Sequence, residues 1–557
     1  METVQPQIKL EINEFERGAP KYNPSFASTT KDVIELIDLY WASRFKGSDK
    51  DSLGVRKVFY SIVDNPVWVS MKMTDIDTKH IKLVPDRSGE EFLVWLLSKE
   101  LKVWMKDNKF DKFLNDVNYS WNKYGTAFAK KVRDKVFLVP VQNLMYDPKA
   151  ESLDKSSFII EKIMMTPDEL REHKEWKNIE SVIEANKDEP NIVIYERFGL
   201  AKDTKDTHFI LAKASGDTAT LLYSDKLDQP YKQLSFDKYP ERLFGVGQVE
   251  KLFEAQIHLN KVQNYKAKGL HWTSKHIYQS RDNGLDRNLM TDVDDGEILR
   301  VNSEIQPIVN EERNLHSYRE EEEVWNSNIE KRTFAYDVMR GERSPAGTPL
   351  GSSILQSQMA GGFFELKREE FGIFIKDIIE EWVLPAFKKA KSPEHIFNFV
   401  GNSDDLEKID KLLAGIGARK SLIKYITNTG KVPSRAEFGM MEALAKEALS
   451  GKSSREFKLP RGAYSDLKYK VDVVITGESV DVQGKITAIQ VALQNTQDPA
   501  EARKLTRKMM ETLGFAEEYI TGEPTQSVNE VAQAQGSQPR LPNSQGTPQL
   551  SQTEQTI

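Results

Sequence analysis

Cysteine is absent from the 557 residues of this chain. Its absence excludes disulfide frameworks, thiolate zinc sites, iron–sulfur clusters and a cysteine nucleophile. Histidine is scarce as well: the eight histidines are scattered, and the two nearest, His271 and His276, are five residues apart and do not share a helix face. Because no HExxH or His-x-x-His spacing occurs on a confident helix, the sequence predicts no metal centre and no cofactor.

Long apolar runs and a surplus of positive charge are also missing. The most apolar stretches, FLVWLL at 92–97 and GIFIKDIIEEWVLPAF at 372–387, are short or interrupted by charges, and the first residues, METVQPQIKLEINEFERG, lack the pattern of a signal peptide. Lys and Arg number 78 against 85 Asp and Glu, a formal net charge of −7. We therefore expect a chain without membrane contact, made in a reducing cytoplasm, that does not coat DNA through its phosphates.

Catalytic motifs begin in several places and are not completed. SGKSS at 450–454 lacks the Gly that opens a phosphate-binding loop, because Lys446 stands at that position. Gly-Val-Gly at 245–247 begins a dinucleotide fingerprint, but Glu250 replaces its third Gly, so a turn that caps the next helix is the better interpretation. The acidic run at 292–297 lacks the full calcium-loop pattern and reads as a solvated turn. We predict no enzyme, although an unrecognised catalytic site stays a third hypothesis.

The first half of the chain shows a mixed α/β pattern. The arm at 1–30 is polar and rich in turn residues, so we expect it to be loosely tied. Thr166-Pro167-Asp168-Glu169 predicts a helix start with a Thr cap. The periodicity predicts helices at 31–46, 89–106 and 109–124, strands within 66–84, a hairpin that turns at Arg133-Asp134, and strands at 158–165, 191–200, 208–214 and 218–224.

The second half is organised around long helices. Two of them, at 247–273 and 310–340, bracket a short β-like insert at 274–309. The four glutamates at 320–323 read as a solvated helix face, or as a charged ring if many copies surrounded an axis. A loop with Gly and Pro at 341–353 precedes a third long helix at 354–390. Small helices at 391–460, a strand at 469–480, a helical pair and a disordered polar tail from about 522 complete the pattern.

Five motifs occur in a fixed order across residues 30–520. They are YGTAF at 124–128 with a hairpin and VPVQNLMYDP at 139–148; FIIE at 158–161 with MTPDEL at 165–170; FGVGQ at 244–248 with Leu252, Gln256, Leu259 and Asn260; the loop at 341–353 ahead of a helix with Trp382, Leu384 and Pro385; and Val471–Gly477 with Asp498-Pro499 and Gly514. In this order they resemble portal proteins, the head-to-tail connectors of tailed double-stranded-DNA bacteriophages. The podovirus-type portals, including those of crAss-like phages, look closest.

The resemblance implies an α+β subunit of a twelve-fold ring around a DNA channel. Its parts would be an N-terminal arm at 1–30, an α/β wing at 31–246, stem helices at 247–273 and 310–340, a clip at 274–309, a tunnel loop at 341–353, a wing helix at 354–390, wing completion with a helical crown at 391–521, and a disordered tail at 522–557. The tail is too polar to form the long helical barrel of some portals.

The same resemblance assigns expected roles to individual residues. The DNA channel would be lined by the tunnel-loop residues Gly341, Glu342, Arg343, Ser344, Pro345, Ala346, Gly347, Thr348, Pro349 and Leu350. Partner docking at the clip would use Asp286, Arg287, Asp292, Asp294 and Asp295. Stem packing would use Leu252, Leu259, Leu315, Tyr318, Trp325, Ile329 and Tyr336, an apolar stripe that suits packing against neighbours in a closed ring.

The implied function is a portal at one capsid vertex through which viral DNA is packaged and ejected. Implied partners are eleven further copies in a dodecamer, double-stranded DNA, the terminase large subunit, the major capsid protein or a scaffold, and head–tail adaptor or neck proteins. The portal would be assembled in the host cytoplasm and located in the virion. The alternative is another virion or assembly subunit, a head–tail adaptor or tail hub, that binds proteins rather than DNA.

Overall fold

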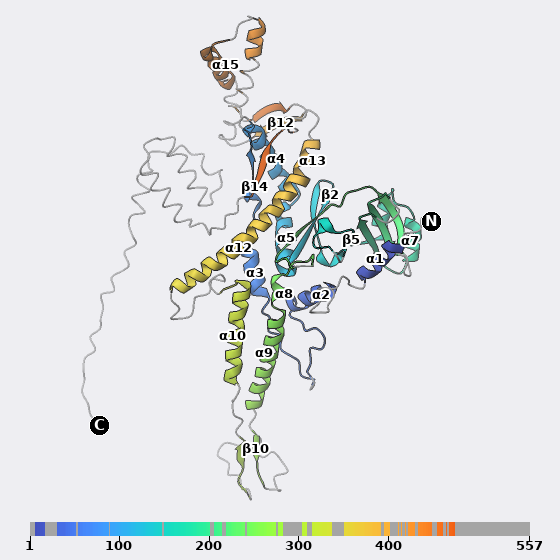
Figure 1. Ribbon diagram of the computed structural model, residues 1–557, viewed down its shortest axis with the longest axis vertical. Coiled ribbons are helices and arrows are strands. Elements are labelled where there is room, and N and C mark those ends of the chain that lie inside the picture. Colours follow the sequence, from blue (N-terminus) through green and yellow to red (C-terminus); the bar gives the residue numbers. More distant parts are fainter. Residues whose placement is uncertain are drawn as a thin grey trace, which may run out of the picture. The chain divides into compact units, whose positions relative to one another are not determined.

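The structure is a computed structural model. It describes residues 6–16, 30–51, 54–87, 90–147, 150–200, 205–213, 219–239, 242–274, 277–281, 303–308, 315–336, 350–390, 395–400, 410, 414, 418, 421–428, 433–447, 454–459, 464 and 467–473. All of them belong to one compact unit, Met1–Gly401 with Asp405–Gly477. Helices alternate with several small sheets, so the fold is mixed α and β, in agreement with the predicted α+β class (Figure 1).

A three-stranded sheet in the order β3-β2-β9 packs against helices. It consists of β2 (Thr126–Val132), β3 (Lys135–Val139) and β9 (Tyr231–Ser235), and the predicted hairpin turn at Arg133, which has a positive φ of 55°, is confirmed. The helices before it are α2 (Thr30–Trp41), α3 (Asp64–Met73), α4 (Glu91–Asp107) and α5 (Phe110–Tyr124). Trp121 of α5 is fully buried, with its ring centroid 5.0 Å from that of Phe236 and 5.6 Å from that of Phe371.

A five-stranded antiparallel sheet follows in the order β4-β5-β6-β7-β8. Its strands are β4 (Leu144–Tyr146), β5 (Ile159–Met165), β6 (Ile192–Phe198), β7 (His208–Lys213) and β8 (Ala219–Asp225). The four predicted strands from 158 to 224 are therefore confirmed. The predicted helix start is confirmed too: Thr166 caps α6 (Pro167–Glu172), and its side chain and that of Glu169 form a capping box.

Helices cover both faces of this sheet. Side chains that alternate along β6 and β7 point to opposite faces. Ile194, Ile210 and Ala212 pack with α6 and α7 (Ile179–Ala185) on one face. Tyr195, Phe209 and Leu211 pack on the other face with Ile8 and Ile12 of α1 (Pro6–Glu16).

The prediction of a loosely tied arm at 1–30 is therefore wrong for its first half. Helix α1 buries Ile8 and Ile12 against the sheet, and the Arg197 side chain forms a bidentate ion pair with Glu11 at 2.7 and 3.2 Å. Arg197 and Glu11 are almost completely buried, at 1% and 7% side-chain exposure. The polar composition of the arm concealed two apolar residues four apart, enough for one side of a short helix.

The two long helices predicted around a β-like insert are present, with different ends. After a short turn of helix, α8 (Gln248–Lys251), comes α9 (Phe253–Thr273), and α10 (Leu315–Thr333) runs beside it (Figure 1). Between them β10 (Ile277–Gln279) pairs antiparallel with β11 (Gln306–Ile308). The prediction that the second helix continues to 340 is wrong, because Phe334 adopts a left-handed backbone with φ of 57°.

The third long helix begins earlier than predicted and is not uniform. Helix α12 (Leu350–Ile378) already includes residues 350–353, which were expected in the loop. A π-helical turn, η5 (Ile379–Val383), separates it from α13 (Leu384–Ala390). A π-turn widens the helix by one residue and changes the direction of the side chains beyond it. It also places Val383 and Leu384 in the same buried cluster as Phe371.

Helix α3 and the strand pair β12–β13 differ from the prediction, whereas the pair β1–β14 contains a predicted strand. The apolar run at 66–73, predicted as a strand, is helix α3, whose buried residues Pro66, Val67, Val69 and Ser70 follow helical spacing. Strands β12 (His395–Val400) and β13 (Ser454–Leu459) pair within the segment that was predicted to be helical, which also contains α15 (Arg435–Glu447). The predicted strand at 469 is confirmed as β14 (Tyr469–Val473), which pairs with β1 (Ile81–Pro85). Single-turn 3₁₀ helices lie at η1 (Thr78–His80), η2 (Val141–Asn143) and η3 (Leu153–Lys155).

Candidate functional site

Helices α9 and α10 hold each other through an apolar seam with ionic pairs beside it. Leu259 and Ile329 are buried in one cluster to which Trp325 contributes. The His258 ring stacks on Trp325 at a centroid distance of 4.7 Å, and its Nε2 lies 3.0 Å from Glu321 Oε1. Lys266 Nζ lies 3.1 Å from Glu322 Oε2. A histidine and a lysine of α9 thus meet carboxylates of α10.

A second face of α9 binds an extended segment of the chain through side-chain amides. Gln256, Asn260 and Asn264, each four residues apart, form what we call the amide ladder. Their side-chain oxygens accept hydrogen bonds from the backbone N–H of Ile62, Tyr60 and Val58 at 3.1, 2.8 and 2.8 Å. Gln256 and Asn264 also donate to the carbonyls of Tyr60 and Val58, at 2.6 and 3.0 Å.

The ladder works because two periodicities match. Four residues of a helix rise about 6 Å, and two residues of an extended chain cover about 6.6 Å. Every second residue of 58–62 therefore meets the next amide of α9. Lys268, four residues after Asn264, continues the row with an ion pair to Asp51 at 2.7 Å.

Three backbones approach closely where α5 passes into β2. Gly125 has a positive φ of 80°, and a side chain there would overlap the backbone of Gly245 and Gly247. Gly125 O accepts a hydrogen bond from Phe236 N at 2.8 Å, and Gly245 N donates to Thr126 Oγ1 at 2.8 Å. Gly247 is the cap residue of α8, which confirms the interpretation of the 245–247 motif as a turn before a helix.

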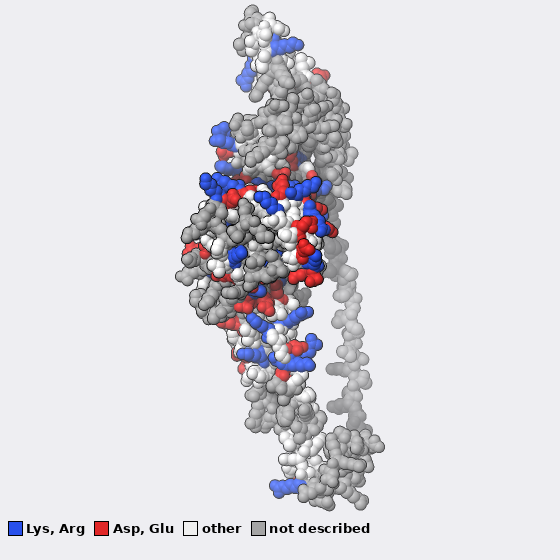
Figure 2. Space-filling view, turned by 90° about the vertical axis from the view of Figure 1, so that its right-hand side faces the viewer, with Lys and Arg blue, Asp and Glu red and all other residues white. Residues whose placement is uncertain are grey.

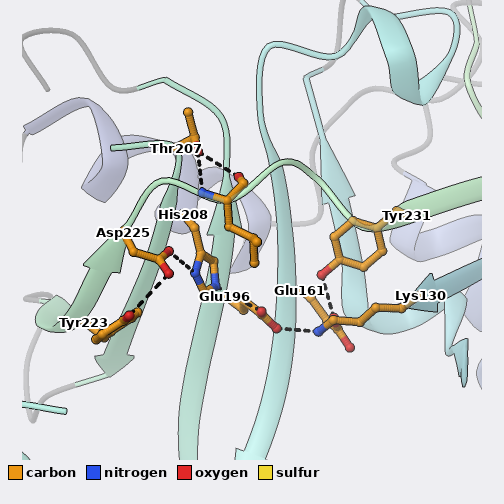
Figure 3. Close-up of polar contacts among 9 residues, drawn as sticks. Lys130, Glu161, Glu196, Thr207, His208, Tyr223, Asp225 and Tyr231 are labelled. Atoms are coloured by element: carbon orange, nitrogen blue, oxygen red, sulfur yellow. Dashed lines mark hydrogen bonds and ion pairs between the residues drawn. The ribbon is translucent and has the colours of Figure 1, made fainter. Parts of the chain in front are cut away.

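A buried polar cluster, which we call the sheet joint, connects the two main sheets (Figure 3). From the three-stranded sheet come Lys130 of β2 and Tyr231 of β9. Lys130 Nζ lies 2.5 Å from Glu161 of β5 and also pairs with Glu196 of β6. Tyr231 donates its hydroxyl hydrogen to Glu161 at 2.6 Å. One ammonium group therefore bridges two carboxylates of the opposite sheet.

The sheet joint continues across the five-stranded sheet. His208 of β7 places Nε2 3.0 Å from Glu196 Oε1 and Nδ1 2.8 Å from Asp225 Oδ1 of β8. Tyr223 donates to the other oxygen of Asp225 at 3.2 Å (Figure 3). Phe198 stacks on the His208 ring at a centroid distance of 4.5 Å. Each ring nitrogen of His208 thus faces a carboxylate.

The charges of the sheet joint favour a protonated histidine. Burial by itself would lower the pKa of His208, but hydrogen bonds to Glu196 and Asp225 outweigh it and raise that pKa above its ordinary value of 6.5. Burial would raise the pKa of Glu196, yet His208 and Lys130 hold it below its ordinary value. In the same way, burial would lower the pKa of Lys130, and Glu196 with Glu161 raises it. With His208 protonated, Lys130 and His208 supply two positive charges against Glu161, Glu196 and the more exposed Asp225.

The arrangement of the sheet joint favours a structural role over a catalytic one. Lys130, Glu161, Glu196 and His208 each expose at most 16% of their side chains, and their charged atoms are turned toward one another. A substrate would have to displace these pairs to reach them. Burying charges without partners would cost several kcal/mol, so the paired set holds the two sheets in one arrangement.

The residues predicted for stem packing are used mainly within the chain. Leu252, Leu259, Trp325 and Ile329 meet in one cluster, and Tyr318 of α10 is half-buried. Tyr336 lies beyond the end of α10 and packs with Ala335, Ala360 and Phe364 in a different cluster. Leu315 is the first residue of α10. The stripe expected to face neighbouring copies is thus largely buried where α8 and α9 pack with α10, α2 and α3.

Most of the other predicted site residues lie outside the residues that the structure describes. Residues 341–349 of the predicted tunnel loop and the predicted clip-docking residues Asp286, Arg287, Asp292, Asp294 and Asp295 fall outside the described residues, as does the tail from 522. Leu350 begins α12. The described parts of the insert are residues 277–281 and 303–308, which include the strand pair β10–β11.

Sequence reasoning missed the amide ladder and the sheet joint. Gln256 and Asn260 were part of a motif, but their spacing with Asn264 was the signal of a common helix face. For the sheet joint the signal was charge inside an otherwise apolar strand, as at Glu161 and Lys162 in FIIEKIMM. Neither signal identifies the residues that these side chains contact, because those residues lie far away in the sequence.

Two classes of site are not found in the described part of the chain. Nowhere among those residues do three acidic or histidine side chains gather in a way that could hold a metal ion. In the same residues, every helix is too short or too polar to cross a bilayer. Comparison with known proteins adds no relative: no family model matches the chain, and no curated protein matches it closely enough to show kinship.

Proposed function

We propose that this chain is a portal subunit of a tailed bacteriophage. Twelve copies would form a ring at one capsid vertex, through which double-stranded DNA enters and leaves. The order of elements supports the proposal: an α/β body, the helix pair α9–α10 around the small antiparallel pair β10–β11, and then the long helix α12 with its π-turn. In this interpretation α9 and α10 are the stem, and β10–β11 belongs to the clip.

One observation carries the proposal further than the others. Although the pair α9–α10 is well packed on its inner side, its outer side exposes large apolar residues: Ile257 at 43%, Tyr265 at 56% and Val324 at 55%. Helix α12 similarly exposes Leu366 and Ile373, seven residues apart and so on one face. Single exposed apolar residues are ordinary, but repetition along three long helices is typical of a surface that another chain covers.

The charge pattern suits a conduit for DNA. On the face drawn in Figure 2, Lys and Arg are mixed with Asp and Glu over the described residues. Phosphate contacts convert directly into salt-dependent affinity, so a cationic wall would retard DNA. A net charge of −7 is compatible with DNA that slides without sticking. The terminase large subunit, capsid or scaffold protein, and neck proteins are the partners that this function requires.

The decisive experiment is the assembly state of the purified full-length chain. We expect mass photometry to give about twelve subunits, and electron microscopy with negative stain to show a ring with a central hole wide enough for a DNA duplex. A monomer at all concentrations would contradict the proposal. A closed assembly whose hole is narrower than DNA would favour the alternative of an adaptor or tail-hub subunit.

A further inference from the structure

We propose that the outer face of α9 in one copy binds the outer face of α10 in the next copy, with an ion pair between Lys261 and Glu323 at its centre. The inference rests on the proposed function, because it names the surfaces through which the ring would close. It differs from the sequence prediction, which placed the packing residues on the stripe that the structure buries inside each chain.

The outer face of α9 is the side that contacts neither α10 nor the segment 58–62. Leu259, with His258 and Lys266, faces α10, and the amide ladder faces the segment 58–62. Ile257, Lys261 and Tyr265, four residues apart, therefore share a third face. All three are exposed. We call these residues the α9 outer face.

The outer face of α10 is defined in the same way. Trp325 and Ile329 point to α9, while Glu320, Glu323 and Val324 are exposed. A residue three or four positions from another shares its side of a helix, so Glu320 lies with both Glu323 and Val324 on the side away from α9. We call these residues the α10 outer face.

The two outer faces match in charge and in polarity. The α9 outer face carries a cation between two apolar side chains, and the α10 outer face carries two carboxylates beside Val324. The same polarity already operates inside the chain, where Lys266 of α9 meets Glu322 of α10. Contact between copies would repeat across the outer faces what the inner faces do within each copy.

The inner contacts also set the level at which the outer faces meet. Helices α9 and α10 run in opposite directions on either side of the strand pair β10–β11 (Figure 1). Lys261 lies between His258, which meets Glu321 and Trp325, and Lys266, which meets Glu322, so we place Lys261 near the height of Glu323. A ring axis along the pair moves each copy sideways without changing its height. Lys261 of one copy then reaches Glu323 of the next, and Ile257 reaches the height of Val324.

A second copy fits these faces better than an unrelated partner. Each chain presents one face of each kind, so the contact is heterologous: it leaves both outer faces occupied only if copies follow one another around a closed ring. A different partner would need its own acidic face for α9 and its own cationic face for α10. A second copy of this chain already provides both the acidic face and the cationic face.

Charge reversal in the full-length chain tests the pairing. Lys261→Glu alone and Glu323→Lys alone should each raise the protein concentration for half-maximal ring formation roughly tenfold or more, because an attraction becomes a repulsion at every interface. The double variant Lys261→Glu/Glu323→Lys should return it to near the wild-type value. Lys112→Glu on α5, an exposed lysine in a helix, is the matched control and should assemble normally. Mass photometry gives ring fraction, and circular dichroism confirms that each variant is folded.

The outcomes separate this inference from the proposed function. If the wild type forms rings and both single reversals form them equally well, the pairing is wrong while the portal proposal stands. If the single reversals fail and the double variant does not recover, these residues matter but do not face each other, and the inference is overturned. If the wild type forms no ring, the proposed function is wrong, and with it the proposed contact between copies. Ile257→Ser with Val324→Ser, which changes no charge, should also weaken assembly; unchanged assembly would count against the apolar part of the interface.

Discussion

At the sheet joint every buried charge meets an opposite charge from another strand of the same chain, whereas on the outer faces of α9 and α10 exposed carboxylates, a lysine and large apolar groups point away from the chain. The charges of the sheet joint are thus paired within one chain, while the outer faces of the helix pair are the surfaces that we propose the next copy covers. Substitutions in the two regions should therefore have different consequences. Changes in the body should lower the free energy of unfolding, and changes on the outer faces should affect assembly.

The largest expected effect is in the body, at Gly125. Gly125→Ala would force a side chain against the backbone of Gly245 and Gly247 at a positive φ, so we expect a loss of roughly 4 kcal/mol or more in the free energy of unfolding, or no folded protein. Urea unfolding followed by circular dichroism measures it. Gly362→Ala on α12, where a Cβ meets nothing within 4 Å, is the control and should stabilise by about 0.5–1 kcal/mol. Equal effects at the two glycines would refute the packing account.

The next effect concerns the attachment of α1 to the five-stranded sheet. Arg197→Leu leaves the buried Glu11 carboxylate without its cationic partner, and breaking a buried ion pair in this way costs about 3–5 kcal/mol. The double variant Arg197→Leu/Glu11→Leu should recover most of that loss, because it removes the uncompensated charge. Chemical denaturation of both variants measures the difference. Lys187→Ala, which breaks an exposed pair with Glu184, should cost less than about 1 kcal/mol.

The amide ladder, which connects the body to the helix pair, should give a smaller effect. Asn260→Ala removes the partner of the Tyr60 N–H, and a lost buried hydrogen bond costs about 1–3 kcal/mol. Hydrogen exchange should show faster exchange at Val58, Tyr60 and Ile62 while the core of α5 keeps its protection. Lys261→Ala, one position further along α9 and outside the ladder, should leave that exchange unchanged. Uniform acceleration over the whole chain would mean that Asn260 acts on global stability instead.

Sequence reasoning located most helices and strands because their patterns are local. The strands at 158–224 and the cap at Thr166 depend on alternation and on residues within one turn, and all are found where predicted. Predictions were wrong where a distant contact decides. The apolar run at 66–73 suits a strand or a helix, and its packing against α5 and α12 selects the helix.

The candidate site was predictable only in outline. The two long helices and the insert were visible from periodicity, but which stripe of each helix would be buried was not. That choice depends on how α9 meets α2, α3 and α10, and on the segment 58–62 that occupies its amide face. The residues left on the outside, Ile257, Lys261 and Tyr265, become recognisable only after those contacts are known.

The smallest expected effect is a pH dependence of stability that originates at the sheet joint. The pKa of His208 is raised in the folded state, so its stabilising charge is fully present below the ordinary pKa of 6.5 and is lost as pH rises through the folded value. Glu196 acts in the opposite direction: its folded pKa is lowered, so its contribution is present above the ordinary value of 4.5 and is lost as pH falls. The joint should therefore contribute most in mildly acidic solution.

His208→Gln tests this account, because Gln keeps a polar side chain in that place and does not titrate. Urea unfolding of the wild type, measured from mildly acidic to mildly alkaline pH, should show stability falling as pH rises above 6.5, and the variant should lose that slope. His173→Gln is the matched control: His173 is exposed and stacks on Trp176 at 4.0 Å, away from the joint, so the slope should persist. Glu196 and Asp225 face the His208 ring in both measurements. The pKa of Glu196 is held below its ordinary value, so Glu196 stays charged over this range. If the slope persists in His208→Gln, another group causes the pH dependence, and the account of a protonated His208 in the sheet joint is wrong.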